Sequence, residues 1–248
     1  IYKTPKTKCT QNSHYSVVDL MTIPDDYIPR SNYGPALDVP AFRKNISPLN
    51  WDKTKLHSET FRLAFRRRVA INGERSMISA ILAPGITHVN TVESIAFQNL
   101  ENLMYTSALS FSLVFDFITK ASGLSDIYSS DFGKFPFAKI PKRVVSLVAF
   151  LHGFNRQYDS LQTADYQSDV EDILSEIIEI PHLHINLLDV KNSRELSKTE
   201  FTRRSALILL DVTVSRSFGF DLESLIELYR IYFPVLKENE DGTWYDQN

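Results

Sequence analysis

Residues 62–85 read RLAFRRRVAINGERSMISAILAPG, and this stretch predicts how the first half of the chain folds. Over residues 60–71 the apolar side chains fall on odd positions, which is the pattern of a half-buried β-strand. Asn72-Gly73 favours a tight hairpin turn, and residues 77–82 read as the returning strand. Residues 87–97 are rich in β-branched side chains and are expected to add a third strand. The sequence therefore predicts an antiparallel sheet.

The hydrophobic pattern changes from strand to helix near residue 98. Residues 100–121 are apolar on nearly every side, so we expect one long, buried helix there. Residues 124–141 contain KFPFAKIP, whose prolines favour an extended segment docked on a surface. Apolar residues at helical spacing predict further helices at residues 143–153, 166–178, 199–217 and 221–232.

These patterns predict an α+β fold in two lobes. The first, at residues 1–141, would contain antiparallel β-structure and the long buried helix. Within it, residues 1–58 are rich in proline and short polar side chains and carry a strand candidate at 15–21. The second lobe, at residues 142–248, would be mainly helical.

Positive charge concentrates on the predicted hairpin. Arg62, Arg66 and Arg68 share the even face of the first strand, Arg67 points the other way, and Arg75 follows the turn. Guanidinium groups suit phosphate oxygens and the acceptor edge of guanine. Residues 1–80 carry a net charge of +6 and residues 81–248 a net charge of −9, which together give −3. The pattern favours a polyanion partner, and the alternative is that these arginines form ion pairs with the acidic half of the chain.

Other classes of site have little support in the sequence. There is no glycine-rich phosphate-binding motif, no nucleophile elbow, and a single cysteine, Cys9. His182 and His184 lack a third metal ligand at suitable spacing, so we expect no metal site. Asp189-Val-Lys191 could end a metal-dependent nuclease motif, which is a distant alternative. We expect no catalytic residue and no bound cofactor in this chain.

The expected compartment is the cytoplasm, without a membrane contact. The single cysteine cannot form an internal disulfide, and no secretory signal opens the chain. The longest strongly apolar stretch, residues 103–118, is shorter than the roughly 20 residues of a membrane span and contains Asp116.

Residues 62–85 resemble the target-recognition region of large bacterial DNA methyltransferases that modify the adenine amino group, including fused type IIG restriction-modification enzymes. The matched positions are Arg66, Glu74, Arg75, Ser76 and Pro84. Later stretches resemble later blocks of that family in the same order: Asn90, residues 104–118, the KFPFAKIP segment, residues 202–236 and residues 240–248. The chain departs from the family at Thr106, where asparagine is common, and in the aromatic residues of KFPFAKIP.

The resemblance implies a DNA sequence-recognition fragment of an adenine-specific methyltransferase or type II restriction enzyme that acts in phage defence. The family's Pro-Pro-aromatic catalytic tetrapeptide and its methyl-donor loop do not occur here. We therefore expect a longer parent chain, with an N-terminal methyltransferase domain that binds S-adenosylmethionine and with or without coupled DNA cleavage. The partner would be double-stranded DNA, and the candidate contacts are Arg62, Arg66, Arg68, Arg75, Ser76, Lys134 and Lys139. The alternative is a protein-interaction or scaffold module that does not contact DNA.

Overall fold

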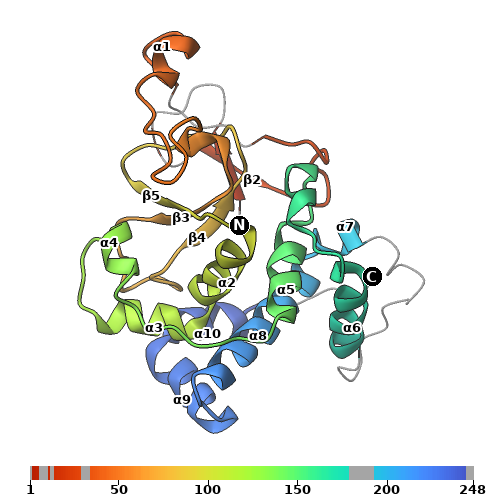
Figure 1. Cartoon of the computed structure of the whole chain (residues 1–248). Coiled ribbons are helices and arrows are strands. Elements are labelled where there is room, and N and C mark those ends of the chain that lie inside the picture. The colour runs from red at the N-terminus through yellow and green to blue at the C-terminus, as the bar shows by residue number, and fades with distance from the viewer. Residues whose placement is uncertain (1, 6–10, 12–13, 29–33, 179–192, 244–248) are drawn as a thin grey trace.

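The computed structural model describes residues 2–5, 11, 14–28, 34–178 and 193–243. Its centre is a three-stranded antiparallel sheet in the order β4-β3-β5, made of β3 (Arg62–Arg66), β4 (Ser79–Leu82) and β5 (Val92–Ala96) (Figure 1). Leu63 pairs with Ile81 on one side and with Ile95 on the other. The predicted antiparallel sheet and its third strand are confirmed.

The connection between β3 and β4 differs from the predicted tight turn. β3 ends at Arg66 because the next residues leave the sheet and bond to residues 125–127 instead. The Val69 N–H donates to the Ser125 carbonyl at 3.0 Å, and the Ile127 N–H donates to the Arg67 carbonyl at 2.8 Å. Gly73 lacks the positive φ that a two-residue hairpin turn requires. The predicted tight hairpin at Asn72-Gly73 is therefore wrong. A turn closes at residues 70–73, where the Gly73 N–H donates to the Ala70 carbonyl at 3.1 Å, but it lies within a longer loop that joins the strands.

The long helix predicted at residues 100–121 is two helices, α2 (Leu100–Phe111) and α3 (Leu113–Ala121). Ser112 lies between them with an extended backbone, and its Oγ accepts a hydrogen bond from the Phe115 N–H at 3.3 Å. Serine is a favoured residue at a helix N-terminus for this reason. The stretch is largely buried as expected, but its apolar pattern does not reveal the break.

The rest of the chain is mainly helical, which confirms the α+β class. The predicted strand near residue 15 is β2 (Tyr15–Val18), which pairs with β1 (Tyr2–Pro5). The four predicted helices correspond to α5 (Arg143–His152), α6 (Tyr166–Ile178), α8 (Glu200–Ser217) and α9 (Leu222–Tyr232). Unpredicted short elements are α1 (Val39–Arg43), η2 (His57–Glu59), α4 (Ser129–Phe132), η3 (Arg156–Leu161), α7 (Ser193–Leu196) and α10 (Pro234–Asp241).

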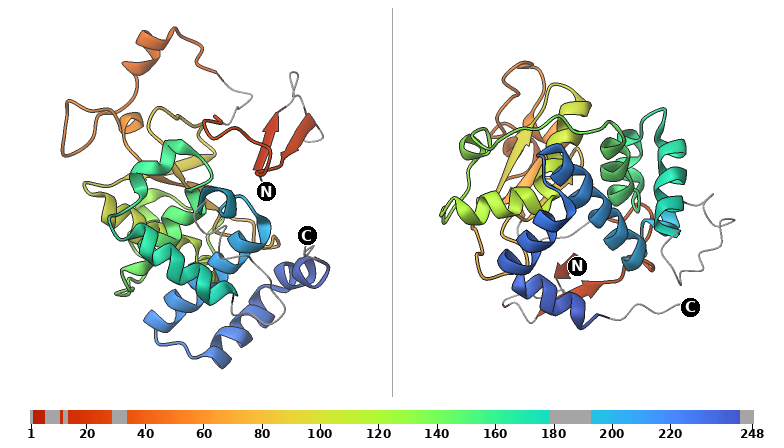
Figure 2. Two further views of the ribbon diagram at one scale, coloured as in Figure 1. Left: turned by 90° about the vertical axis from the view of Figure 1, so that its right-hand side faces the viewer. Right: turned by 90° about the horizontal axis from the view of Figure 1, so that it is seen from below.

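One hydrophobic core runs from the sheet through the helices on one of its faces. It joins Leu63 of β3 to Leu109 of α2, Leu147 of α5 and Leu210 of α8, so it continues across residue 141. A smaller cluster around Phe233 packs α9 and α10 against α3. Figure 2 shows the hairpin of β1 and β2 standing apart from this body. The division into lobes at residue 141 stays a prediction.

Within the described residues, no helix is both long enough and apolar enough to cross a membrane.

Candidate functional site

The three arginines predicted to share an exposed strand face have different surroundings. Arg62 is only 3% exposed, because residues 42–47, 57–58 and 87–88 cover that face of the sheet. Arg66 is exposed at the end of β3. Arg68 lies beyond the strand, and its Nε is 3.1 Å from Asp126 Oδ1. The expectation of one continuous cationic face is therefore wrong, since the covering loops and the early end of β3 separate these side chains.

Arg67 is also held within the protein. Its Nη1 donates to Asn90 Oδ1 at 2.8 Å, its Nε is 3.9 Å from Asp126 Oδ1, and its guanidinium lies 5.7 Å from the centre of the Tyr128 ring. These contacts all lie within the protein.

Arg75 and Ser76 belong to a buried polar network that joins the β3–β4 loop to α3 and α8. Arg75 Nη2 is 3.3 Å from Asp211 Oδ2, and Arg75 Nε is 3.8 Å from Asp116 Oδ2. Asp116 Oδ1 accepts from the N–H groups of Ser76 at 2.7 Å and Met77 at 3.1 Å. Asp211 Oδ1 accepts from the Leu113 N–H at 2.6 Å, at the first turn of α3. We call these residues the Arg75 network.

The residues of the Arg75 network are poorly placed to contact a ligand at the protein surface. Ser76 is fully buried, and its hydroxyl donates to the Ala70 carbonyl at 3.2 Å. Burial raises the pKa of both Asp116 and Asp211, while the neighbouring Arg75 opposes that rise. For Arg75 and Ser76, the geometry supports the intramolecular alternative over DNA contact.

Lys134 and Lys139 lie on the segment between α4 and α5. Lys134 is exposed and forms a local ion pair with Asp131 at 2.8 Å. Lys139 is exposed, and no ion pair or hydrogen bond of its ammonium group occurs within the part of the chain that the structure describes. Of the two predicted lysines, Lys134 has an ion-pair partner, whereas Lys139 has none among the described residues.

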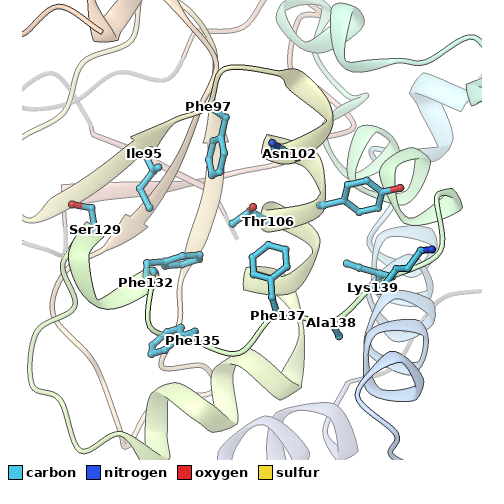
Figure 3. Close-up of a pocket in the computed structure, with 13 residues that line it drawn as sticks. Ile95, Phe97, Asn102, Thr106, Ser129, Phe132, Phe135, Phe137, Ala138 and Lys139 are labelled. Carbon is cyan, nitrogen blue, oxygen red and sulfur yellow. The ribbon is translucent and has the colours of Figure 1, made fainter. Parts of the chain in front are cut away.

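Lys139 lies at the junction of two hollows. The first has a volume of about 830 Å³ and is bounded by β5, α2, α4 and the segment before α5 (Figure 3). It is rich in aromatic side chains, namely Phe97, Tyr105, Phe132, Phe135 and Phe137. Phe137 is 67% exposed although it is large and apolar. This half of the site offers ring faces and edges to a ligand.

The second hollow has a volume of about 770 Å³ and shares Lys139 and Ile140 with the first. Its other wall is α8, which contributes Thr213 and Arg216, and Arg143 lies at its edge. In the part of the chain that the structure describes, no Asp or Glu lines either hollow. We call the two hollows together the Lys139 groove: an aromatic half and a cationic half joined by Lys139.

Arg143 and Arg216 were not among the predicted site residues. One sequence signal points to Arg143, because residues 132–158 contain five Lys and Arg and no Asp or Glu. No comparable signal marks Arg216, which reaches the groove only because α8 packs beside the start of α5.

Among the described residues, no three His, Cys, Asp or Glu side chains gather in a way that could hold a metal ion. Cys9, His182, His184, Asp189 and Lys191 lie outside the described residues.

His152 was not singled out by the sequence but is buried where α5 meets the sheet. Its Nδ1 is 2.8 Å from the Val148 carbonyl, and its Nε2 accepts from the Ile81 N–H at 3.3 Å. Burial lowers the pKa of His152 to about 4. A neutral imidazole that donates through Nδ1 and accepts through Nε2 satisfies both contacts, so His152 links α5 to β4.

Comparisons with protein-family models, with curated proteins and with solved structures find no match to this chain. The candidate site is therefore interpreted from its own geometry and charge.

Proposed function

We propose that this chain binds double-stranded DNA through the Lys139 groove, as the sequence-recognition part of an adenine-specific DNA methyltransferase or restriction-modification enzyme. The observation that carries the DNA-binding part is the groove itself. Lys139, Arg143 and Arg216 line one half of it, and no carboxylate of the described residues lines either half. Such an arrangement attracts phosphate oxygens, while the acidic remainder of the chain limits nonspecific coating of DNA.

The adenine-methylation part of the proposal rests on the sequence resemblance. In that setting the catalytic residues and S-adenosylmethionine belong to an N-terminal domain of the parent chain. This chain would contribute positioning contacts to the backbone and contacts to base edges, which are the two elements of sequence recognition. Exposed Arg66 and Arg68 are additional candidate contacts in this proposal, although Arg68 would first have to leave Asp126.

A protein-interaction module is the second candidate. The observation that favours it is the aromatic half of the groove, where exposed Phe137 lines the same hollow as Phe97 and Phe135 (Figure 3). An apolar peptide side chain would fit there without any need for the cationic half.

The two candidates respond differently to salt and to loss of charge. We expect duplex binding with a dissociation constant of about 10⁻⁴ to 10⁻⁶ M for the chain alone, weakening steeply as salt rises. Replacing Lys139 and Arg216 by glutamine removes two cations, so the slope of log K against log salt should fall by about 2 and affinity by at least about tenfold. Fluorescence anisotropy with a labelled duplex measures both quantities.

A Lys134→Gln variant provides the matched control, because Lys134 lies on the same segment but pairs with Asp131 outside the groove. Its binding should match that of the unaltered chain. Unchanged affinity and slope in the Lys139→Gln/Arg216→Gln variant would reject the groove as the DNA-binding surface. Binding of an apolar peptide that does not depend on salt and is lost in Phe137→Ser would favour the protein-interaction module.

A further inference from the structure

A smaller hollow of about 360 Å³ lies on the other face of the sheet from the Lys139 groove. Ser94 of β5 lines this hollow, whereas the next residue, Ile95, lines the groove. Successive strand residues point to opposite faces, so the two sites are separated by the sheet. Arg62 lies at the base of the smaller hollow, and residues 42–47, 57–58 and 87–88 contribute its walls. We call it the Arg62 pocket.

Arg62 is a buried cation that has no counter-charge among the described residues. Its Nη1 donates to Ser94 Oγ at 3.4 Å and its Nη2 donates to the Ile86 carbonyl, while its buried Nε has no hydrogen-bond partner. No Asp or Glu among the described residues forms an ion pair with it. Burial lowers the pKa of this guanidinium, but arginine starts so high that it stays protonated. A buried charge that meets only neutral groups is unfavourable.

Most of the other polar side chains that line the pocket carry hydroxyl groups or imidazoles, which can donate hydrogen bonds. Four hydroxyl side chains line the pocket, from Ser47, Ser58, Thr87 and Ser94, together with the imidazoles of His57 and His88. His88 Nε2 is 2.8 Å from Ser94 Oγ, which connects this imidazole to Arg62. No carboxylate from the described ranges lines the pocket.

We infer that the Arg62 pocket binds a phosphate group, either free or at the end of a small phosphate ester. A guanidinium recognises phosphate oxygens in a fixed geometry, and the surrounding hydroxyls can donate to the remaining oxygens. The volume is near the lower end of the range of about 300–1,000 Å³ that small-molecule sites occupy. A bound phosphate would neutralise Arg62, which forms no ion pair with any described residue.

Calorimetric titration of the chain tests this inference, with inorganic phosphate and adenosine monophosphate as separate ligands at an ionic strength held constant with sodium chloride. We expect one binding site. Arg62→Met keeps the length of the side chain but removes its charge, so affinity should fall at least about tenfold. The matched control is Arg230→Met, which changes an exposed arginine of α9 that does not line the pocket and should leave the affinity unchanged.

The ligands distinguish the two sources of the phosphate. Monophosphate affinity at least about tenfold above that of inorganic phosphate would assign a phosphate ester, and equal affinities would assign free phosphate. Failure of both ligands to bind at about 10 mM, or adenosine binding as tightly as its monophosphate, would overturn the inference. If Arg62→Met does not fold, the Thr87→Val/Ser94→Ala variant takes its place, and unchanged phosphate affinity in that variant would equally overturn it.

Discussion

Arg62 and Arg75 come from one predicted hairpin, and both are largely buried, yet their surroundings differ. Arg75 lies between the carboxylates of Asp116 and Asp211, whereas Arg62 meets a carbonyl and a hydroxyl. The difference shows that burial alone does not define the role of a charged side chain. The two carboxylates beside Arg75 indicate a structural role, whereas Arg62 lines the pocket in which we propose a phosphate ligand.

The largest effect is expected at the Arg75 network. Arg75→Met would remove the guanidinium that pairs with buried Asp116 and Asp211, and removing one partner of a buried ion pair costs about 3–5 kcal/mol. Lys120 and Arg204 remain as the other cations that act on these carboxylates. We expect the free energy of unfolding to fall by about this amount, measured by urea denaturation at about pH 7. Arg66→Met, at an exposed position, should change it by less than about 0.5 kcal/mol.

The pH dependence of that loss gives an internal control. Burial raises the pKa of both carboxyl groups in the folded state, so the folded chain binds their protons more tightly than the unfolded chain does. In Arg75→Met, protonation therefore neutralises the two carboxylates that have lost their ion-pair partner, as pH falls through their raised pKa values. The difference between Arg75→Met and the unaltered chain should be smaller at about pH 4.5 than at about pH 7. A loss independent of pH would contradict the charge-based explanation.

His152 differs from the two buried arginines, because it is a buried base that can lose its proton and become neutral. Its folded-state pKa of about 4 lies below the ordinary value of 6.5, so the unfolded chain binds the proton more tightly. The resulting stability is present above pH 6.5 and is lost as pH falls toward about 4, by up to about 3 kcal/mol. His152→Gln should lack this component in denaturation curves across that range. An equally steep acid loss in the variant would assign the effect to other groups.

Ser112 tests how much of the Arg75 network depends on the local break between α2 and α3. Ser112→Ala removes the side-chain cap of α3 but leaves Asp211 bonded to the Leu113 N–H. We therefore expect a loss of about 1 kcal/mol in thermal or urea unfolding, well below that of Arg75→Met. Ser175→Ala, at an exposed helical serine, should have a smaller effect. A loss as large as that of Arg75→Met would mean that the cap, rather than the ion pairs, maintains the break.

Arg62→Met should change the free energy of unfolding by no more than about 1 kcal/mol, far less than Arg75→Met, because the change removes a buried charge together with two hydrogen bonds to neutral groups. Thermal unfolding without added phosphate measures it. A loss comparable to that of Arg75→Met would show that Arg62 is structural after all and would remove the distinction between the two arginines.

Local patterns predicted most of the secondary structure. Period-2 alternation located β3, and the amphipathic spacing at residues 166–178 matches α6. The tight turn at Asn72-Gly73 and the single helix at residues 100–121 were wrong for a common reason. Both places depend on a partner far away in the chain. After Arg66 the backbone bonds to residues 125–127 and leaves the sheet, and Asp211 accepts a hydrogen bond from the first residue of α3. A local sequence window contains neither partner.

The sequence by itself determined the α+β class, the order of the main strands and helices, and the chemical nature of the side chains available to a site. Only the tertiary structure decided which cationic side chains are buried, which form ion pairs and which line a groove. It covered Arg62 with distant loops, paired Arg75 with carboxylates from α3 and α8, and placed Arg216 of α8 in one groove with Lys139. The physical reason is that backbone preference and hydrophobic period act between near neighbours, whereas burial and ion pairing depend on residues brought together from far apart in the chain.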